Sequence, residues 1–167
     1  MSPDAIGLTA IVSGTVLAAA VDLRTRRVPN VITLSLAAAG LMMAFTGLGR
    51  VGLVASLLGL GLGVALMLPS HVFGATGAGD VKLFAAVGAF LGPAGILSAF
   101  LYTAIAGGVL AIVIAISRGR VRQTFGSAAR LVASGAANKD LVEHPSANNR
   151  FAYAPAIAIG TVVAVLA

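Results

Sequence analysis

Two aspartates stand where apolar segments of the sequence meet more polar ones, and they are the side chains best suited to chemistry. Asp22 ends the first apolar segment and Asp80 begins the fourth. The other three acids, Asp4, Asp140 and Glu143, lie near the terminus or in the main polar stretch. Ionisable side chains near membrane depth are costly to bury and often functional. Asp22 and Asp80 are therefore the candidate site.

Two carboxylates at close range cannot easily both ionise, so such a pair shares a proton and titrates as a unit. The ionised member can take a proton from water. The neutral member can hydrogen-bond a scissile carbonyl and later donate its proton. A pair of this kind can hydrolyse a peptide bond without a covalent intermediate. Which aspartate would act as acid and which as base stays open.

Structural roles are the alternative for both aspartates. Asp22 could pair with Arg24 or Arg26, and Asp80 could cap the fourth segment and pair with Lys82. The surroundings of Asp80 favour the catalytic role, because it ends the GxGD motif at residues 77–80. The two glycines of this motif permit positive φ values and close approach by an extended substrate. Irregular backbone at membrane depth is tolerated where it lines a wet cavity.

Composition places these residues in a membrane protein. Of the 167 residues, 59% are hydrophobic and only 10% are charged, whereas soluble domains carry about 25% charged residues. Runs near 20 apolar residues can cross a bilayer core of about 30 Å. The apolar segments lie at about 5–21, 31–45, 51–68, 81–91, 94–116 and 151–167. We expect an all-α, polytopic fold of about six transmembrane helices, forming a single membrane-embedded domain over 1–167.

The distribution of Lys and Arg predicts the orientation of these spans. With six spans, the three arginines of the first loop, Lys82 and the polar loop at about 118–150 all fall on the cytoplasmic side. Arg50 falls on the other side. Both termini are then non-cytoplasmic, and the two aspartates could meet at one depth. The first segment lacks a basic start, so we expect a retained span and not a signal peptide.

Several classes of function are excluded or weakened. The sequence has no cysteine, which rules out disulfides and thiol chemistry. Its two histidines, His71 and His144, form no HExxH zinc pair. Topology explains the net charge of +6 better than nucleic-acid binding does. A small transporter and a non-enzymatic assembly subunit stay open, although transporter acids tend to lie near the membrane midplane.

Three patches of the sequence resemble one family. The GxGD motif is similar to that of intramembrane aspartyl peptidases, and the closer resemblance is to type IV prepilin peptidases of the short Tad/Cpa-type form. The patches are residues 22–30, where an aspartate precedes a basic loop and Pro-Asn, residues 77–83, and residues 150–156 before the last segment. In this order the three patches bracket nearly the whole chain.

The resemblance implies that Asp22 and Asp80 are catalytic. It implies removal of a short basic leader from prepilins or pseudopilins at the cytoplasmic face of the bacterial inner membrane, with the substrate's apolar helix inserted beside the enzyme. It implies no metal or organic cofactor for proteolysis. Longer family members also N-methylate the new terminus with an extra region that often bears cysteine pairs. Without cysteine, we expect peptidase activity alone.

Neighbouring residues have milder expected roles. Those predicted to shape the site or contact substrate are Gly77, Gly79, Lys82, Arg24, Pro29 and Asn30. Pro29 suits a helix start, where its missing N–H costs little. Tyr153 and Pro155 are expected to form an interfacial anchor and a helix start. His71 is expected to be a solvated residue in the loop before Gly77.

Overall fold

The fold is built from helices alone in the part of the chain that the structure describes. The computed structural model describes residues 3–117 and 152–167. The helices are α1 (Pro3–Thr25), α2 (Asn30–Thr46), α3 (Leu53–Val72), α4 (Ala78–Ser117) and α6 (Ala154–Leu166). The all-α prediction is confirmed over these ranges. The predicted polar loop at 118–150 lies outside them.

Three helices are long and apolar enough to cross a membrane. The qualifying stretches are Ala5–Thr25 in α1, Leu53–Val72 in α3 and Ala78–Ile114 in α4. The other two, α2 and α6, are apolar but have only 17 and 13 residues. Many large apolar side chains are exposed, among them Val31 at 75% and Phe45 at 73%. Exposed apolar surface on this scale indicates a partner such as lipid. Six spans remain a prediction.

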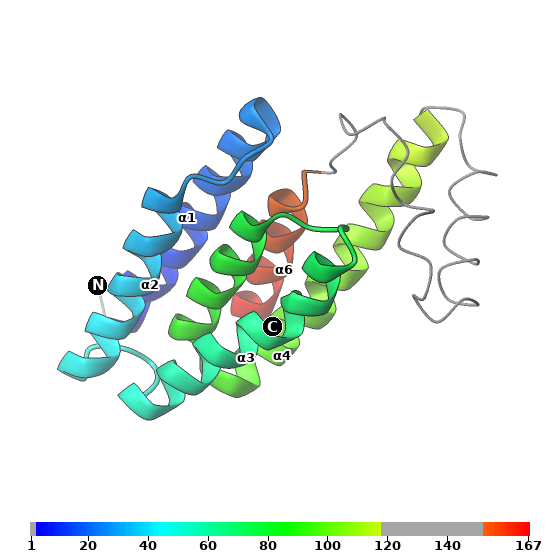
Figure 1. The fold of residues 1–167 in the computed structure, drawn as a ribbon. Helices are drawn as coiled ribbons and strands as arrows, with labels where there is room; N and C mark the ends of the chain where they lie inside the picture. Colours follow the sequence, from blue (N-terminus) through cyan, green and yellow to red (C-terminus); the bar gives the residue numbers. More distant parts are fainter. Residues whose placement is uncertain (1–2, 118–151) are drawn as a thin grey trace.

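The helix α4 consists of two segments that meet at Gly92. This glycine has φ 69° and ψ −174°, which is not helical and is a conformation that essentially only glycine adopts. Pro93 follows, at the first position of a new helix, where its missing N–H costs little. The chain turns back at this point (Figure 1). The turn predicted at Gly92-Pro93 is therefore present.

The first segment of α4 is the central helix of the bundle. From Asp80 to Phe90 every residue except Lys82 is buried. The neighbours α2, α3 and α6 all pack against α4. A helix that is apolar on all sides is expected to be enclosed by its neighbours. This central position places the Asp80 carboxyl inside the bundle and not on its surface.

Small residues let α3 lie directly against this central helix. A Cβ on Gly59 would collide with the carbonyl oxygen of Gly88, and one on Gly88 would collide with that of Gly59. The Ser56 hydroxyl donates a hydrogen bond of 2.6 Å to the Ala89 carbonyl. Close packing of membrane helices through small residues takes this form. Gly61, in contrast, faces open space.

The helix ends that carry the candidate residues gather at one end of the bundle. The end of α1 and the beginnings of α4 and α6 lie there, whereas the start of α1 and the end of α6 lie toward the opposite end (Figure 1). The end of α1 carries Asp22, and the first turn of α4 carries Asp80.

Candidate active site

Asp22 and Asp80, whose closeness the sequence left open, line the same cavity. The cavity has a volume of about 290 Å³, and its lining residues are Asp22, Arg26, Arg27, Val28, Gly77, Ala78, Gly79 and Asp80. One water molecule needs roughly 10–15 Å³ of such space. The cavity can therefore hold several water molecules between the end of α1 and the start of α4.

Both carboxyl groups are shielded from solvent. Asp22 is 4% exposed and Asp80 is 5% exposed. Burying a carboxylate is costly unless it is paired or hydrogen-bonded. Burying two carboxyl groups on one cavity therefore costs stability, and packing alone does not require it. Among the described residues, no group of three or more His, Asp or Glu side chains could hold a metal ion.

One oxygen of Asp80 caps its own helix. Asp80 is the third residue of α4, and its Oδ2 accepts a hydrogen bond of 2.9 Å from the N–H of Gly77, directly before the helix. This is the back-reaching half of a capping box. Its other oxygen, Oδ1, is buried and has no hydrogen-bond partner among the described residues. The capping alternative is thus correct for Oδ2, whereas Oδ1 takes no part in the cap.

Asp22 is held by the start of α6. Its Oδ2 accepts a hydrogen bond of 3.3 Å from the N–H of Ala154, the first residue of that helix. Pro155, which follows, has no N–H to offer. The positive end of the α6 dipole therefore faces the Asp22 carboxylate through a single backbone donor. The sequence predicted a helix start here, but it did not predict this contact.

The loop after α1 closes over the motif. Arg26 has φ 52°, and its N–H donates to the Asp22 carbonyl at 2.7 Å, which ends α1. The loop then passes so close to Gly79 that a Cβ there would lie 2.9 Å from the Val28 Cβ. Neither Gly77 nor Gly79 has a positive φ. Gly79 thus admits a segment of this chain at the position where we had expected a substrate backbone.

A polar contact ties this loop to α4. The Lys82 ammonium donates a hydrogen bond of 2.9 Å to Asn30 Oδ1, so it holds the start of α2 against the start of α4. Pro29 is the N-cap residue of α2, and its carbonyl accepts the first N–H groups of that helix. Arg24 lies exposed in the last turn of α1 and is not among the residues that line the cavity.

His71 belongs to a helix and not to a loop, so its predicted placement is wrong. It lies in the last turn of α3, which continues past Pro69 to Val72. Its Nδ1 donates a hydrogen bond of 3.0 Å to the Thr76 carbonyl. The side chain is exposed, as expected. The bond fastens the end of α3 to the turn that leads into the GxGD motif.

Tyr153 is a neighbour of the site that sequence reasoning treated only as an anchor. Burial raises the pKa of its phenol, and the charge of Asp80 raises that pKa further. The phenol therefore stays protonated at neutral pH. Its position directly before Ala154, inside the third sequence patch, was the available signal.

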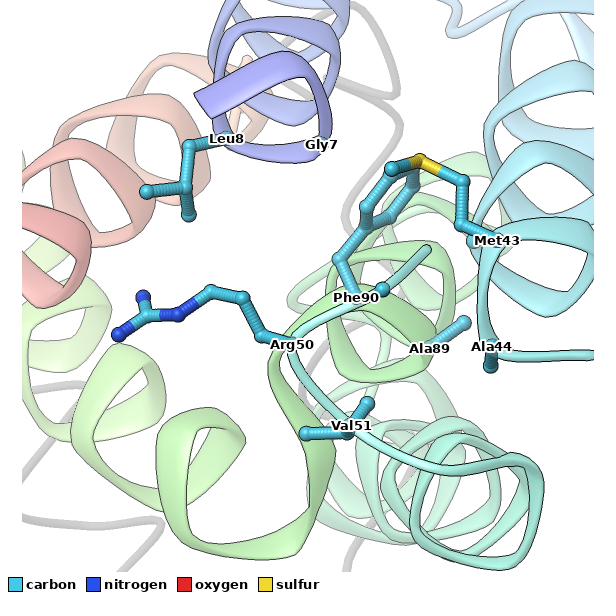
Figure 2. A pocket seen from close by; sticks show the side chains of 10 residues that line it. Gly7, Leu8, Met43, Ala44, Arg50, Val51, Ala89 and Phe90 are labelled. Atoms are coloured by element: carbon cyan, nitrogen blue, oxygen red, sulfur yellow. The ribbon is translucent and has the colours of Figure 1, made fainter. Parts of the chain in front are cut away.

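A second cavity lies away from these acids and does not resemble an active site. It has a volume of about 10 Å³, enough for about one water molecule. Figure 2 shows its lining, in which Phe90 and Met43 lie together, Leu8 lies apart from them, and Arg50 comes from the α2–α3 connection. No acid lines it. The chemistry of the described residues is therefore concentrated at Asp22 and Asp80.

Comparison with known proteins places the chain in a family. Residues 9–112 match the model of the type IV leader peptidase family. This stretch is more than half of the chain and includes both aspartates and the GxGD motif. Neither the curated proteins nor the solved structures gave a match.

Proposed function

We propose that this chain, which belongs to the type IV leader peptidase family, is an aspartic endopeptidase that removes the leader of type IV prepilins or pseudopilins. The observation that carries the proposal is the pair of buried carboxyl groups on one cavity large enough for water. Membership of the family supports peptidase activity. Asp22 and Asp80 are the residues that we propose catalyse the hydrolysis.

The proposed reaction is acid–base hydrolysis. One carboxylate of the pair takes a proton from a water molecule, and the oxygen of that water attacks the scissile carbonyl carbon. The protonated partner meanwhile donates a hydrogen bond to the carbonyl oxygen. The tetrahedral intermediate then collapses, the C–N bond breaks, and a proton passes to the leaving amine. The Asp80 oxygen Oδ1 is buried and accepts no hydrogen bond from the described residues, so the proposed reaction requires it to become exposed to water or substrate. Proton exchange belongs to the pair and not to either residue alone.

The proposed location is the cytoplasmic face of the bacterial inner membrane. Arg24 lies at the end of α1, Arg26 and Arg27 line the cavity, and Lys82 lies in the first turns of α4. Arg50 lies between α2 and α3. Basic residues gather on the cytoplasmic side of membrane proteins, which supports this orientation. Because arginines line the cavity, we expect the basic part of a leader to bind outside it.

The test is processing of a co-expressed prepilin, followed as a size shift on a gel. We expect Asp22→Asn and Asp80→Asn each to reduce processing by at least about 100-fold, at unchanged membrane levels. Asp4→Asn, which changes an acid at the opposite end of α1, is the matched control and should process normally. Processing that persists in either site variant would exclude the two-aspartate mechanism and favour a transporter or an assembly subunit.

A further inference from the structure

The peptide group between Thr76 and Gly77 is hydrogen-bonded at both of its ends. Its carbonyl accepts a hydrogen bond of 3.0 Å from Nδ1 of His71, in the last turn of α3. Its N–H donates a hydrogen bond of 2.9 Å to Oδ2 of Asp80, in the first turn of α4. One planar peptide group therefore connects the His71 imidazole to a candidate catalytic carboxyl group.

The hydrogen bond at the carbonyl acts on the donor at the other end of the same peptide group. Because the carbonyl and the N–H share one plane, a donor that holds the Thr76 carbonyl also holds the direction of the Gly77 N–H. Consecutive hydrogen bonds polarise one another, so donation to the carbonyl also makes the N–H a stronger donor. His71 thus influences Asp80 without touching it.

The turn that carries this peptide group is anchored to the end of α3. The backbone N–H groups of Ala75 and Thr76 donate to the Ser70 carbonyl at 2.9 and 3.3 Å. The His71 side chain then holds the Thr76 carbonyl itself. Gly77, the next residue, lines the cavity together with Asp80. The His71 bond is therefore the step at which the anchored turn meets the site.

The imidazole contributes a donor to this turn rather than packed surface. His71 is exposed, whereas Thr76 is 7% exposed and Asp80 is 5% exposed. A carbonyl oxygen can only accept, so the bond places a proton on Nδ1, which both the neutral Nδ1–H tautomer and the charged imidazolium supply. The bond does not depend on the ring being charged.

We propose that His71 is a positioning residue for Asp80, which it orients as a hydrogen-bond donor through the peptide group between Thr76 and Gly77. The inference rests on the proposed peptidase function. The Gly77 N–H holds Oδ2 and so sets the plane of the carboxyl group, which includes the direction of Oδ1. Without the His71 donor the peptide group can turn, so the chemical step slows while substrate binding is unchanged.

The first test compares kcat and KM for a prepilin that the wild type cleaves, with enzyme and substrate reconstituted together in lipid vesicles. His71→Leu removes the donor, and we expect kcat to fall about 5-fold with KM unchanged. His71→Asn has nearly the shape of His71→Leu but keeps an uncharged N–H donor, so kcat should stay near the wild-type value. Val72→Ala, at the exposed residue that follows, is the control and should change neither constant.

Nuclear magnetic resonance follows the same hydrogen bond without measuring activity. The sequence has two Thr-Gly pairs, at 46–47 and 76–77. Labelling threonine carbonyl carbons and glycine nitrogens together therefore selects the amide signals of Gly47 and Gly77 alone. The Gly77 proton should lie further upfield in His71→Leu than in His71→Asn, because a weaker hydrogen bond deshields it less. Both variants lack the imidazole, so its ring current does not enter this comparison, and Gly47, at the end of α2, should not move.

Equal kcat values in His71→Leu and His71→Asn would overturn the positioning role, whether both match the wild type or both fall because the charge is lost. A Gly77 signal at the same place in both variants would overturn the link through the peptide group. Either result, with Asp80→Asn inactive, leaves the peptidase proposal intact. Activity in Asp80→Asn would overturn the peptidase proposal itself.

Discussion

The Asp80 carboxyl accepts a hydrogen bond from the Gly77 N–H at 2.9 Å through Oδ2, while its Oδ1 is buried without a partner among the described residues. One side chain therefore has two environments. The first oxygen completes the start of α4, as a helix cap does. The second is the oxygen left for the proposed chemistry. Structure and chemistry can be separated by substitution because they use different oxygens.

Asparagine and alanine at position 80 should have different effects on stability. Asp80→Asn keeps an oxygen that can accept from Gly77, so the free energy of unfolding should change little. Asp80→Ala removes the cap and should lower the free energy of unfolding by about 1 kcal/mol. Both variants should lose peptidase activity. Thermal unfolding in detergent, with activity measured on the same samples, checks the difference. Equal destabilisation by Asn and Ala would show that the cap requires the charge.

The Tyr153 phenol should ionise at a higher pH than free tyrosine. In a Tyr102→Phe background only Tyr153 remains to titrate, and burial and Asp80 both raise its pKa above the ordinary value of 10.0. The protonated form is favoured by folding. Its contribution to stability is therefore complete below about pH 10 and declines as pH rises toward the folded pKa. Tyrosinate absorbance during a pH titration measures the midpoint.

A charge-neutral variant tests the cause of that shift. Adding Asp80→Asn to the same background removes the neighbouring charge, so the Tyr153 midpoint should fall. It should stay above that of free tyrosine because burial is unchanged. A midpoint that does not change on this substitution would place the phenol out of electrostatic reach of Asp80.

The sequence was most informative where one physical rule dominated. Long apolar runs predicted the helices, and Gly92-Pro93 predicted the turn inside α4. Counting the helices between Asp22 and Asp80 indicated only that the two could lie at one depth, since each span reverses the direction of the chain, and their common cavity was not predicted. These predictions depend on the length of the apolar runs and on the alternating direction of successive spans, and both can be read from a single sequence.

Contacts between remote segments were not predictable in the same way. The bond from Ala154 to Asp22 joins residues 132 positions apart, and no local pattern encodes it. Gly79 was interpreted as room for substrate, although Val28 of the same chain fills that space. The third apolar segment was predicted to end at about residue 68. Its helix continues for another turn, as membrane helices can around proline.

Gly92→Ala should destabilise the bundle through its backbone. A side chain at φ 69° and ψ −174° costs about 1–3 kcal/mol, and the new Cβ would also lie 3.0 Å from Val51 Cγ1. The melting temperature in detergent should fall. Gly108→Ala, in the second segment of the same helix and facing open space, is the control and should not lower it. An unchanged melting temperature for Gly92→Ala would mean that the turn adapts without cost.

Gly79→Ala should disturb the site by displacing the loop that covers it. The new Cβ would lie 2.9 Å from the Val28 Cβ and 3.1 Å from the Val28 carbonyl oxygen. A shift of about 1 Å at a catalytic site can cost on the order of 100-fold in rate, so we expect prepilin processing to fall by roughly one to two orders of magnitude. Gly61→Ala adds a methyl group in open space on α3 and should process normally.

The cause of that loss can be tested by relieving the contact from the other side. Val28→Gly removes the closest atom that a Cβ at position 79 would meet. Combined with Gly79→Ala, it should restore part of the processing, while the carbonyl contact keeps recovery incomplete. If the double variant is no more active than Gly79→Ala alone, the glycine is required by the substrate and not by the loop. That outcome would return Gly79 to the role first inferred from the GxGD motif.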